Sequence, residues 1–194
     1  MKKKKPARKG VKKPARQVTK VKAGAAIAAG KPAKRQPLPF ISTGYWLLKS
    51  EPESYSIDAL ARDGKALWTG VRNYQARNFM TTSMKPGEKF IFYHSNAEPS
   101  AAVGIGRIER VNLPDVSALD ASGEYYDAKA SQDHPIWFCC EVAFEQKLKR
   151  PVPLAELRRT PALAKLRLLQ PGQRLSILPL EPDEFALLVK LGNS

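Results

Sequence analysis

The basic residues of this chain are concentrated at its amino-terminal end. We therefore expect the folded part to lie in the rest of the chain. Residues 1–40 contain 14 of the 33 Lys and Arg residues and none of the 18 Asp and Glu residues. The other 19 basic residues therefore face 18 acidic ones, so the rest of the chain is nearly neutral. Like charges repel, and large aliphatic side chains are scarce at this end. We expect a disordered, Lys/Pro/Ala-rich basic arm over residues 1–43 and one folded domain over residues 44–194.

The arm carries a short repeat, KKPAR, at residues 4–8 and again at residues 12–16. Proline in each unit opposes helix formation, and a run of Lys and Arg attracts a polyanion by releasing its condensed counterions. We therefore expect the arm to bind DNA or RNA phosphates without sequence preference; a merely solubilising terminus is the alternative. The candidate phosphate-binding residues are Lys2, Lys3, Lys4, Lys5, Arg8, Lys9, Lys12, Lys13 and Arg16.

The sequence contains no pattern typical of a membrane span, a secretory leader or a metal site. No run approaches the roughly 20 apolar residues that cross a bilayer, and no apolar segment follows the charged start. Cys139 and Cys140 are adjacent, so on a strand they would point to opposite faces and could neither pair nor share a metal. We expect an intracellular protein, cytoplasmic or nucleoid-associated if bacterial, with buried free thiols, no metal and no cofactor.

Hydrophobic periodicity over the rest of the chain predicts strands mixed with short helices. Gly104 and Gly106 lie two apart on one face of an expected strand, which indicates a bend or the close approach of another backbone or a ligand. The regular strand–helix alternation of a doubly wound fold is missing. We therefore expect an α+β domain with a small curved β-sheet or barrel and flanking short helices. The expected strands are 45–50, 66–70, 88–95, 101–112, 136–148 and 173–180, and the expected helices are 57–63, 74–84, 154–169 (broken at Pro161) and 181–192.

The stretch LWTGVRNYQARNFM, residues 67–80, concentrates stacking and hydrogen-bonding side chains. Asn73 is a plausible helix N-cap, and the spacing of Ala76, Phe79 and Met80 predicts a core stripe. The opposite face would carry Tyr74, Arg77, Asn78 and Thr81, which suits recognition of a nucleic acid. Trp68 offers a flat stacking surface, and backbone N–H groups at the helix entry near Gly70 are expected to face an anion. A solvated helix face and a buried polar network are the alternatives.

Several segments resemble, in order and spacing, the EVE domain family. They are YWLLKSEPES, LWTGVRNYQARNFM, FIFYHSN, VGIGRIERV, YYDAKA and RLSILPL, and the resemblance covers residue 45 to about residue 191. The resemblance implies a PUA-like fold and non-catalytic binding of nucleic acid. It further implies that a modified base, such as a methylated or hydroxymethylated cytosine, enters a pocket.

The resemblance also implies which residues form that base pocket. Family members often carry an acidic residue where this chain has Thr69, and Thr accepts a hydrogen bond without charge and with a shorter reach. The preferred base or its affinity is therefore expected to differ. The implied pocket residues are Lys49, Ser50, Glu51, Trp68, Gly70, Val71, Asn73, Tyr74, Arg77, Asn78, His94, Ser95 and Asn96.

Two other classes of function stay open on sequence alone. One is an adaptor that binds a small molecule or a peptide, and the other is a small hydrolase or nuclease. Catalysis is disfavoured because no nucleophile motif such as G-x-S-x-G and no prominent pair of carboxylates is present. We expect Trp46 and Trp137 to be core residues, and we weigh His94 evenly between a structural and a functional role. Tyr125 and Tyr126 either stack on a ligand or pack on the sheet edge.

Overall fold

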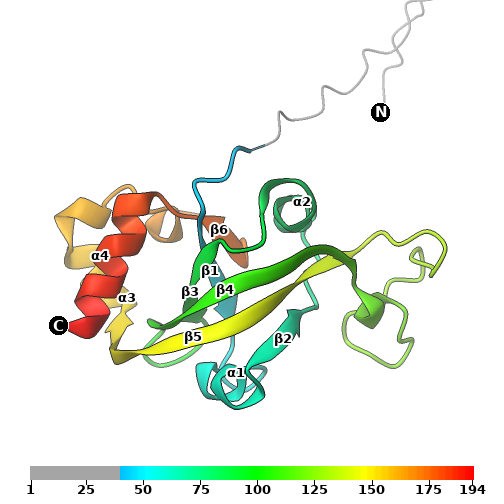
Figure 1. Cartoon of the computed structure of the whole chain (residues 1–194), viewed down its shortest axis with the longest axis horizontal. Coiled ribbons are helices and arrows are strands. Elements are labelled where there is room, and N and C mark those ends of the chain that lie inside the picture. The colour runs from blue at the N-terminus through cyan, green and yellow to red at the C-terminus, as the bar shows by residue number, and fades with distance from the viewer. Residues whose placement is uncertain (1–39) are drawn as a thin grey trace, which may run out of the picture. The chain divides into compact units, whose positions relative to one another are not determined.

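The structure, a computed structural model, describes residues 40–194; the predicted basic arm lies outside the described residues up to residue 39. Six strands form one mixed sheet in the order β2-β5-β4-β3-β1-β6 (Figure 1). The sheet is therefore open, with β2 and β6 at its edges, and the predicted α+β class is confirmed. The strands are β1 (Tyr45–Ser50), β2 (Lys65–Trp68), β3 (Lys89–His94), β4 (Ala101–Pro114), β5 (Phe138–Pro153) and β6 (Ile177–Pro179). The helices are α1 (Ile57–Asp63), α2 (Tyr74–Asn78), α3 (Leu154–Arg159) and α4 (Pro182–Asn193), with a π-helical turn η1 (Phe79–Ser83) and 3-10 turns η2 (Val116–Ala118), η3 (Pro161–Leu163) and η4 (Arg167–Leu169).

The pairing of the strands determines where the chain's loops meet. β1 and β3 run parallel, with Ser50 opposite His94 at their ends, while the other neighbouring strands are antiparallel. β4 and β5 are the longest strands and run side by side across the domain, from the end near α3 and α4 to the loop of residues 115–137 (Figure 1). The carboxyl ends of β1 and β3 consequently lie next to each other at one end of the sheet.

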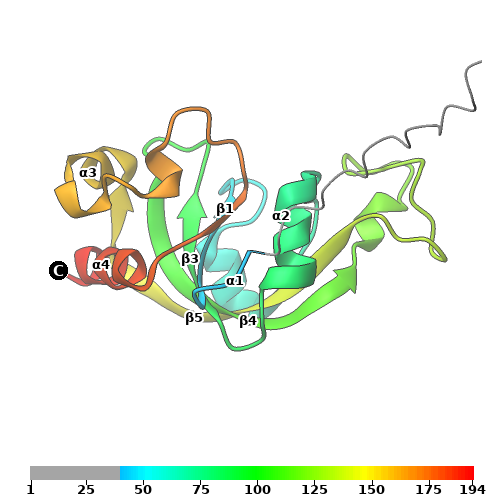
Figure 2. The same ribbon diagram turned by 90° about the horizontal axis from the view of Figure 1, so that it is seen from above.

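Both faces of the sheet are buried, which explains the almost continuous apolar run in β3. Trp46 and Leu48 of β1 belong to one core cluster, to which α1 and α2 also contribute. Leu47, between them, belongs to a second cluster that includes residues of α3 and α4. Figure 2 shows α3 and α4 together at one end of the domain, with α2 farther along. Successive strand residues thus alternate between two cores.

The glycine pair of β4 permits two close contacts, as the sequence predicted. A Cβ at Gly106 would overlap the ring of Phe90. A Cβ at Gly104 would lie 2.5 Å from the Cδ1 atom of Ile57, which begins α1. Backbone carbonyl oxygens also lie close to these Cβ positions, that of Gln146 at 3.0 Å from residue 104 and that of Ala143 at 2.6 Å from residue 106, so both positions favour glycine.

The predicted helix 74–84 exists but changes its winding. Asn73 caps α2, because its Oδ1 accepts hydrogen bonds from the backbone N–H groups of Gln75 and Ala76. After Asn78 the chain continues as η1, in which the Met84 N–H donates to the Phe79 carbonyl at 2.8 Å. The hydroxyls of two threonines donate to the Asn78 carbonyl where the winding changes. Despite this change, the predicted core stripe is confirmed: Ala76, Phe79 and Met80 are buried.

The first described residues belong to the packed domain. The Phe40 ring contacts the rings of Trp46 and Phe79, with centroids 6.1 and 5.7 Å apart. Phe40 therefore covers one side of the core. Trp46 is completely buried, and both cysteines are buried free thiols, as expected.

Candidate functional site

The main pocket of the domain has a volume of about 600 Å3 and is lined by residues at or just after the carboxyl ends of β1, β2 and β3. Its volume falls within the range of roughly 300–1,000 Å3 that is typical of small-ligand sites. Five segments that are far apart in the sequence surround it. The lining residues are Lys49, Ser50, Glu51, Ser54, Tyr55, Leu67, Trp68, Thr69, Gly70, Val71, Arg72, Ser95, Glu124, Tyr125, Arg174 and Ser176.

Strand pairing positions one wall of this pocket. The Ser95 N–H donates to the Ser50 carbonyl at 3.0 Å, which extends the parallel pairing of β1 and β3 by one step. On the other side of β1, the Lys49 N–H donates to the Ser176 carbonyl at 2.8 Å. After β1 the chain turns, with the Tyr55 N–H donating to the Glu51 carbonyl at 2.9 Å. These bonds place side chains from three segments around one opening.

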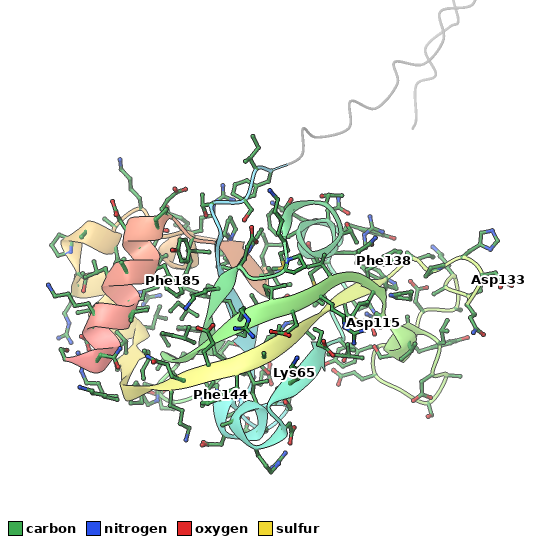
Figure 3. The ribbon with its side chains drawn as sticks, in the orientation of Figure 1. Lys65, Asp115, Asp133, Phe138, Phe144 and Phe185 are labelled. Carbon is green, nitrogen blue, oxygen red and sulfur yellow. The ribbon has the colours of Figure 1, made fainter. Side chains whose placement is uncertain are left out.

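A buried carboxylate, Asp115, holds the opposite wall. Its Oδ2 accepts hydrogen bonds from the Gly70 N–H at 3.0 Å and from Nη1 of Arg72 at 2.8 Å. Its Oδ1 accepts from the backbone N–H and the hydroxyl of Ser117. Burial opposes the charge of this carboxylate, but the hydrogen bonds from Ser117, Arg72 and Gly70 outweigh burial and keep the pKa of Asp115 below its ordinary value. Figure 3 shows Asp115 and Phe138 at the end of the sheet where the loop of residues 115–137 leaves and returns.

Arg72 fixes this loop against the segment that follows β2. Its guanidinium donates to the Tyr125 carbonyl from both Nε, at 2.8 Å, and Nη2, and lies 5.6 Å from the Tyr125 ring centre. The ring is packed so closely on Gly70 that a Cβ there would lie 2.9 Å from the Cε2 atom of Tyr125. Gly70 also has a φ of +77°, which side chains disfavour. The position of Tyr125 on the pocket wall thus depends on glycine at residue 70.

Several polar groups on the pocket wall have no hydrogen-bond or ion-pair partner among residues 40–194. They are the side chains of Lys49, Glu51, Thr69 and Arg174, which lie in four different parts of the wall. Burial lowers the pKa of the Lys49 ammonium, because partial desolvation disfavours its charge. Groups of both charges and a neutral hydroxyl are therefore available to a ligand.

The structure brings seven of the thirteen predicted site residues to this pocket: Lys49, Ser50, Glu51, Trp68, Gly70, Val71 and Ser95. The other six do not line it: Asn73, Tyr74, Arg77, Asn78, His94 and Asn96. Most of those six use their polar atoms within the fold. The ring of His94 accepts the Ile57 N–H at 3.1 Å, and Arg77 donates to the Ile136 carbonyl at 3.0 Å.

Two expectations about the stretch 67–80 are corrected. Trp68 is only 7% exposed and packs edge-on against Phe92, with centroids 5.4 Å apart, so most of its ring belongs to the core. Truncating it would create a core cavity as well as alter the pocket. The backbone N–H groups expected to face an external anion are already bonded, that of Gly70 to Asp115 and those after Asn73 to the Asn73 side chain.

Sequence reasoning missed part of the wall. Arg72 lies within the stretch of residues 67–80, but no sequence pattern linked it to its partner, because Asp115 is 43 residues away. Tyr55 also lines the pocket; burial and its hydrogen bond to Asp63 raise the pKa of Tyr55 to about 12. The segment of Arg174 and Ser176 carried no signal beyond an expected strand. These contributions depend on nonlocal pairing that no local motif reveals.

The described part of the chain offers no obvious site for a metal. Within residues 40–194, no group of three or more His, Cys, Asp or Glu side chains is placed to hold an ion. In the same range, no helix is both long enough and apolar enough to cross a membrane.

The mixed sheet and its flanking helices define a PUA-like α+β domain. The chain belongs to the EVE domain family, which it matches over residues 44–191. It is 38% identical over 167 residues to human thymocyte nuclear protein 1, an alignment that covers 77% of this chain and 74% of the relative.

Two solved structures share this fold. A crystal structure of a protein from Pseudomonas putida is 47% identical, with a TM-score of 0.73, and the match covers 76% of this chain and 99% of that one. A crystal structure of human THYN1 protein in complex with DNA containing 5-methylcytosine is 36% identical, with a TM-score of 0.71, and covers 77% of this chain and 98% of that one.

Proposed function

We propose that this domain binds nucleic acid without catalysis and holds a modified base, a methylated or hydroxymethylated cytosine, in the main pocket. One observation carries the proposal: the chain is 36% identical to a protein crystallised with DNA that contains 5-methylcytosine. A pocket of suitable size in this chain supports it. The proposal rests both on the residues of this chain's pocket wall and on the ligand of that relative.

The pocket wall contains the groups that recognition of an extruded base requires. A base is bound by stacking on an aromatic ring and by hydrogen bonds to its edge. Tyr125 is 38% exposed and supplies a ring at the wall. Thr69 and Glu51 can accept hydrogen bonds from an exocyclic amine, while Lys49 and Arg174 can donate to a carbonyl or a phosphate. Together they offset the few kcal/mol that unstacking a base costs.

The basic arm has a separate role in this proposal. Its nine candidate residues, from Lys2 to Arg16, would contact phosphates and add affinity without sequence preference. The pocket would supply the preference for a modified base. The described domain is nearly neutral by comparison, so it would contribute few of the salt-sensitive contacts.

The test is to measure binding of residues 40–194 to short labelled oligonucleotides by fluorescence anisotropy. The Pseudomonas putida structure matches over 99% of its own chain, so a domain of this extent folds without an arm. Cytosine would be plain, methylated or hydroxymethylated, in DNA and in RNA, at low and high salt. We expect a modified cytosine to bind more tightly than the plain base, and this preference to persist at high salt.

A matched pair of variants tests whether the pocket causes that preference for a modified base. Tyr125→Ala removes the ring at the wall, and we expect it to lose about 1–3 kcal/mol of binding free energy. Tyr126→Ala removes a neighbouring ring that is 46% exposed and does not line the pocket, so it should bind as the wild type does. Equal, salt-labile binding to every oligonucleotide would contradict the pocket assignment. Turnover of the strand with a divalent metal would instead favour the nuclease alternative.

A further inference from the structure

A row of aromatic and arginine side chains leads from the pocket to the exposed ring of Tyr74. Arg72 lies 5.6 Å from the ring centre of Tyr125 and 5.3 Å from that of Trp137. The rings of Trp137 and Tyr74 are stacked, with centroids 4.8 Å apart and planes 26° from parallel. Tyr74 therefore lies at the outer end of a row whose inner end, Tyr125, lines the pocket.

The Tyr74 ring is exposed and lies next to a guanidinium. Arg77 Cζ lies over this ring, 4.7 Å from its centre, and 6.0 Å from the ring centre of Trp137. The residue still retains 58% of its accessible surface, so Tyr74 remains open to a ligand.

The support beneath this ring is held in place. Trp137 is 5% exposed, and its Nε1 donates to the Asp127 carboxylate at 2.7 Å. Arg77 donates through Nη1 to the Ile136 carbonyl and through Nε and Nη2 to the Asn78 side chain. A flat ring on a fixed base loses little conformational entropy when a ligand stacks on it.

We propose that Tyr74 is a second stacking platform, which binds a base flanking the one in the pocket on the same strand, with the Arg77 charge beside it for the phosphate. This inference rests on the proposed function and extends it from one base to a strand. An exposed aromatic ring next to a guanidinium is the combination that single-stranded nucleic acids bind. The sequence placed Tyr74 and Arg77 in the base pocket; their position outside its lining assigns them to the neighbouring nucleotide.

The experiment compares two strands that differ only beside the modified base. One carries a single 5-methylcytosine with ordinary flanking nucleotides, and the other has abasic residues in place of the flanking bases. We expect wild-type residues 40–194 to prefer the ordinary strand by about 5- to 150-fold, the equivalent of about 1–3 kcal/mol for one stacked base. Tyr74→Ala should abolish that preference, and Tyr74→Phe should keep it.

Tyr125→Ala separates the platform from the pocket. We expect it to weaken both strands by a similar factor and to keep the preference for intact flanks, because the two sites act on different nucleotides. The platform is overturned if the wild type is indifferent to the flanking bases, or if Tyr74→Ala retains the preference. If neither strand binds the wild type, the proposed function itself fails, and the platform fails with it. Thermal melting of each variant confirms that the comparison is made between folded proteins.

Discussion

The two aromatic residues Trp68 and Tyr125 line the same pocket, but Trp68 mainly stabilises the core and Tyr125 mainly forms the pocket wall. Trp68 is 7% exposed and contributes chiefly to the core, whereas Tyr125 is 38% exposed and presents its ring to the pocket. Tyr125 holds that position through its carbonyl, which accepts hydrogen bonds from Arg72, and through the absence of a side chain at Gly70. A residue with no side chain is thus as important to the pocket wall as the ring that it accommodates.

We predict that Gly70→Ala destabilises the domain more than Gly87→Ala does. Both glycines have positive φ, at +77° and +90°. An alanine at either position would adopt the left-handed backbone conformation, which costs about 1–2 kcal/mol. Only at residue 70 would the new Cβ also meet the Tyr125 ring; nothing lies within 4 Å at residue 87. Urea unfolding measures the difference in the free energy of unfolding.

The same pair of variants reports on the pocket. Gly70→Ala should weaken binding of a 5-methylcytosine strand because the Tyr125 ring must move, while Gly87→Ala should bind normally. Equal destabilisation by the two variants, with unchanged binding, would show that the contact between Gly70 and Tyr125 is unimportant.

The first turn of α1 is stabilised from within the helix and from a neighbouring strand. Ser56 caps the helix, its hydroxyl accepting the Ala59 N–H at 3.1 Å. His94, at the end of β3, accepts the Ile57 N–H through Nε2. Since a protonated imidazole cannot accept a hydrogen bond there, the contact requires a neutral ring. This geometry favours the structural reading of His94 over a functional one.

We predict that this contact makes the stability of the domain fall as the medium becomes mildly acidic. Burial lowers the pKa of His94 from its ordinary value of 6.5. As pH falls, the unfolded chain binds a proton at this residue before the folded one does. The His94 contribution is therefore complete above pH 6.5 and is lost progressively below it.

Urea unfolding of the wild type and His94→Gln at about pH 7.5 and about pH 5.5, on either side of the ordinary histidine pKa, measures this effect. Glutamine retains an acceptor for the Ile57 N–H but does not titrate. The wild type should lose more stability than the variant on acidification. The same loss in both proteins would mean that other groups account for the pH dependence.

At the scale of the whole molecule, basic and acidic residues are distributed unevenly along the chain. Residues 1–40 carry 14 basic residues and no acidic one, while the rest has 19 basic and 18 acidic residues. Within the described domain, many of these charges are paired across strands, for example Lys65 with Glu109 and Arg110 with Glu141. Exposed pairs of this kind contribute little to stability, but they leave the domain with little net attraction for phosphate.

We predict that removing residues 1–39 flattens the salt dependence of nucleic-acid binding and leaves the preference for a modified base unchanged. Each phosphate that the arm neutralises should contribute about 0.9 to the slope of log affinity against log salt on duplex DNA. Binding titrations of the full chain and of residues 40–194 across a range of salt concentrations give both quantities. A truncation that alters the ratio of affinities for methylated and plain cytosine would contradict this division of roles.

Local chemistry made much of the fold predictable. Asn73 was expected to cap a helix and does so, because an N-cap depends only on the next few residues. The family resemblance added the PUA-like architecture, since its motifs are long and span the whole domain. Where a residue's role is settled by its neighbours in the chain, the sequence alone was sufficient.

Only the tertiary structure decided which side chains share the pocket. Tyr74 and Arg77 lie in the same motif as Trp68 and Gly70, yet the helix turns them away from the pocket lining. Conversely, Arg174 reaches the pocket because β6 pairs with β1. Such proximity depends on strand register and on the path of the loop of residues 115–137, and these are determined by the packing of the whole domain, since neither is encoded within any one segment.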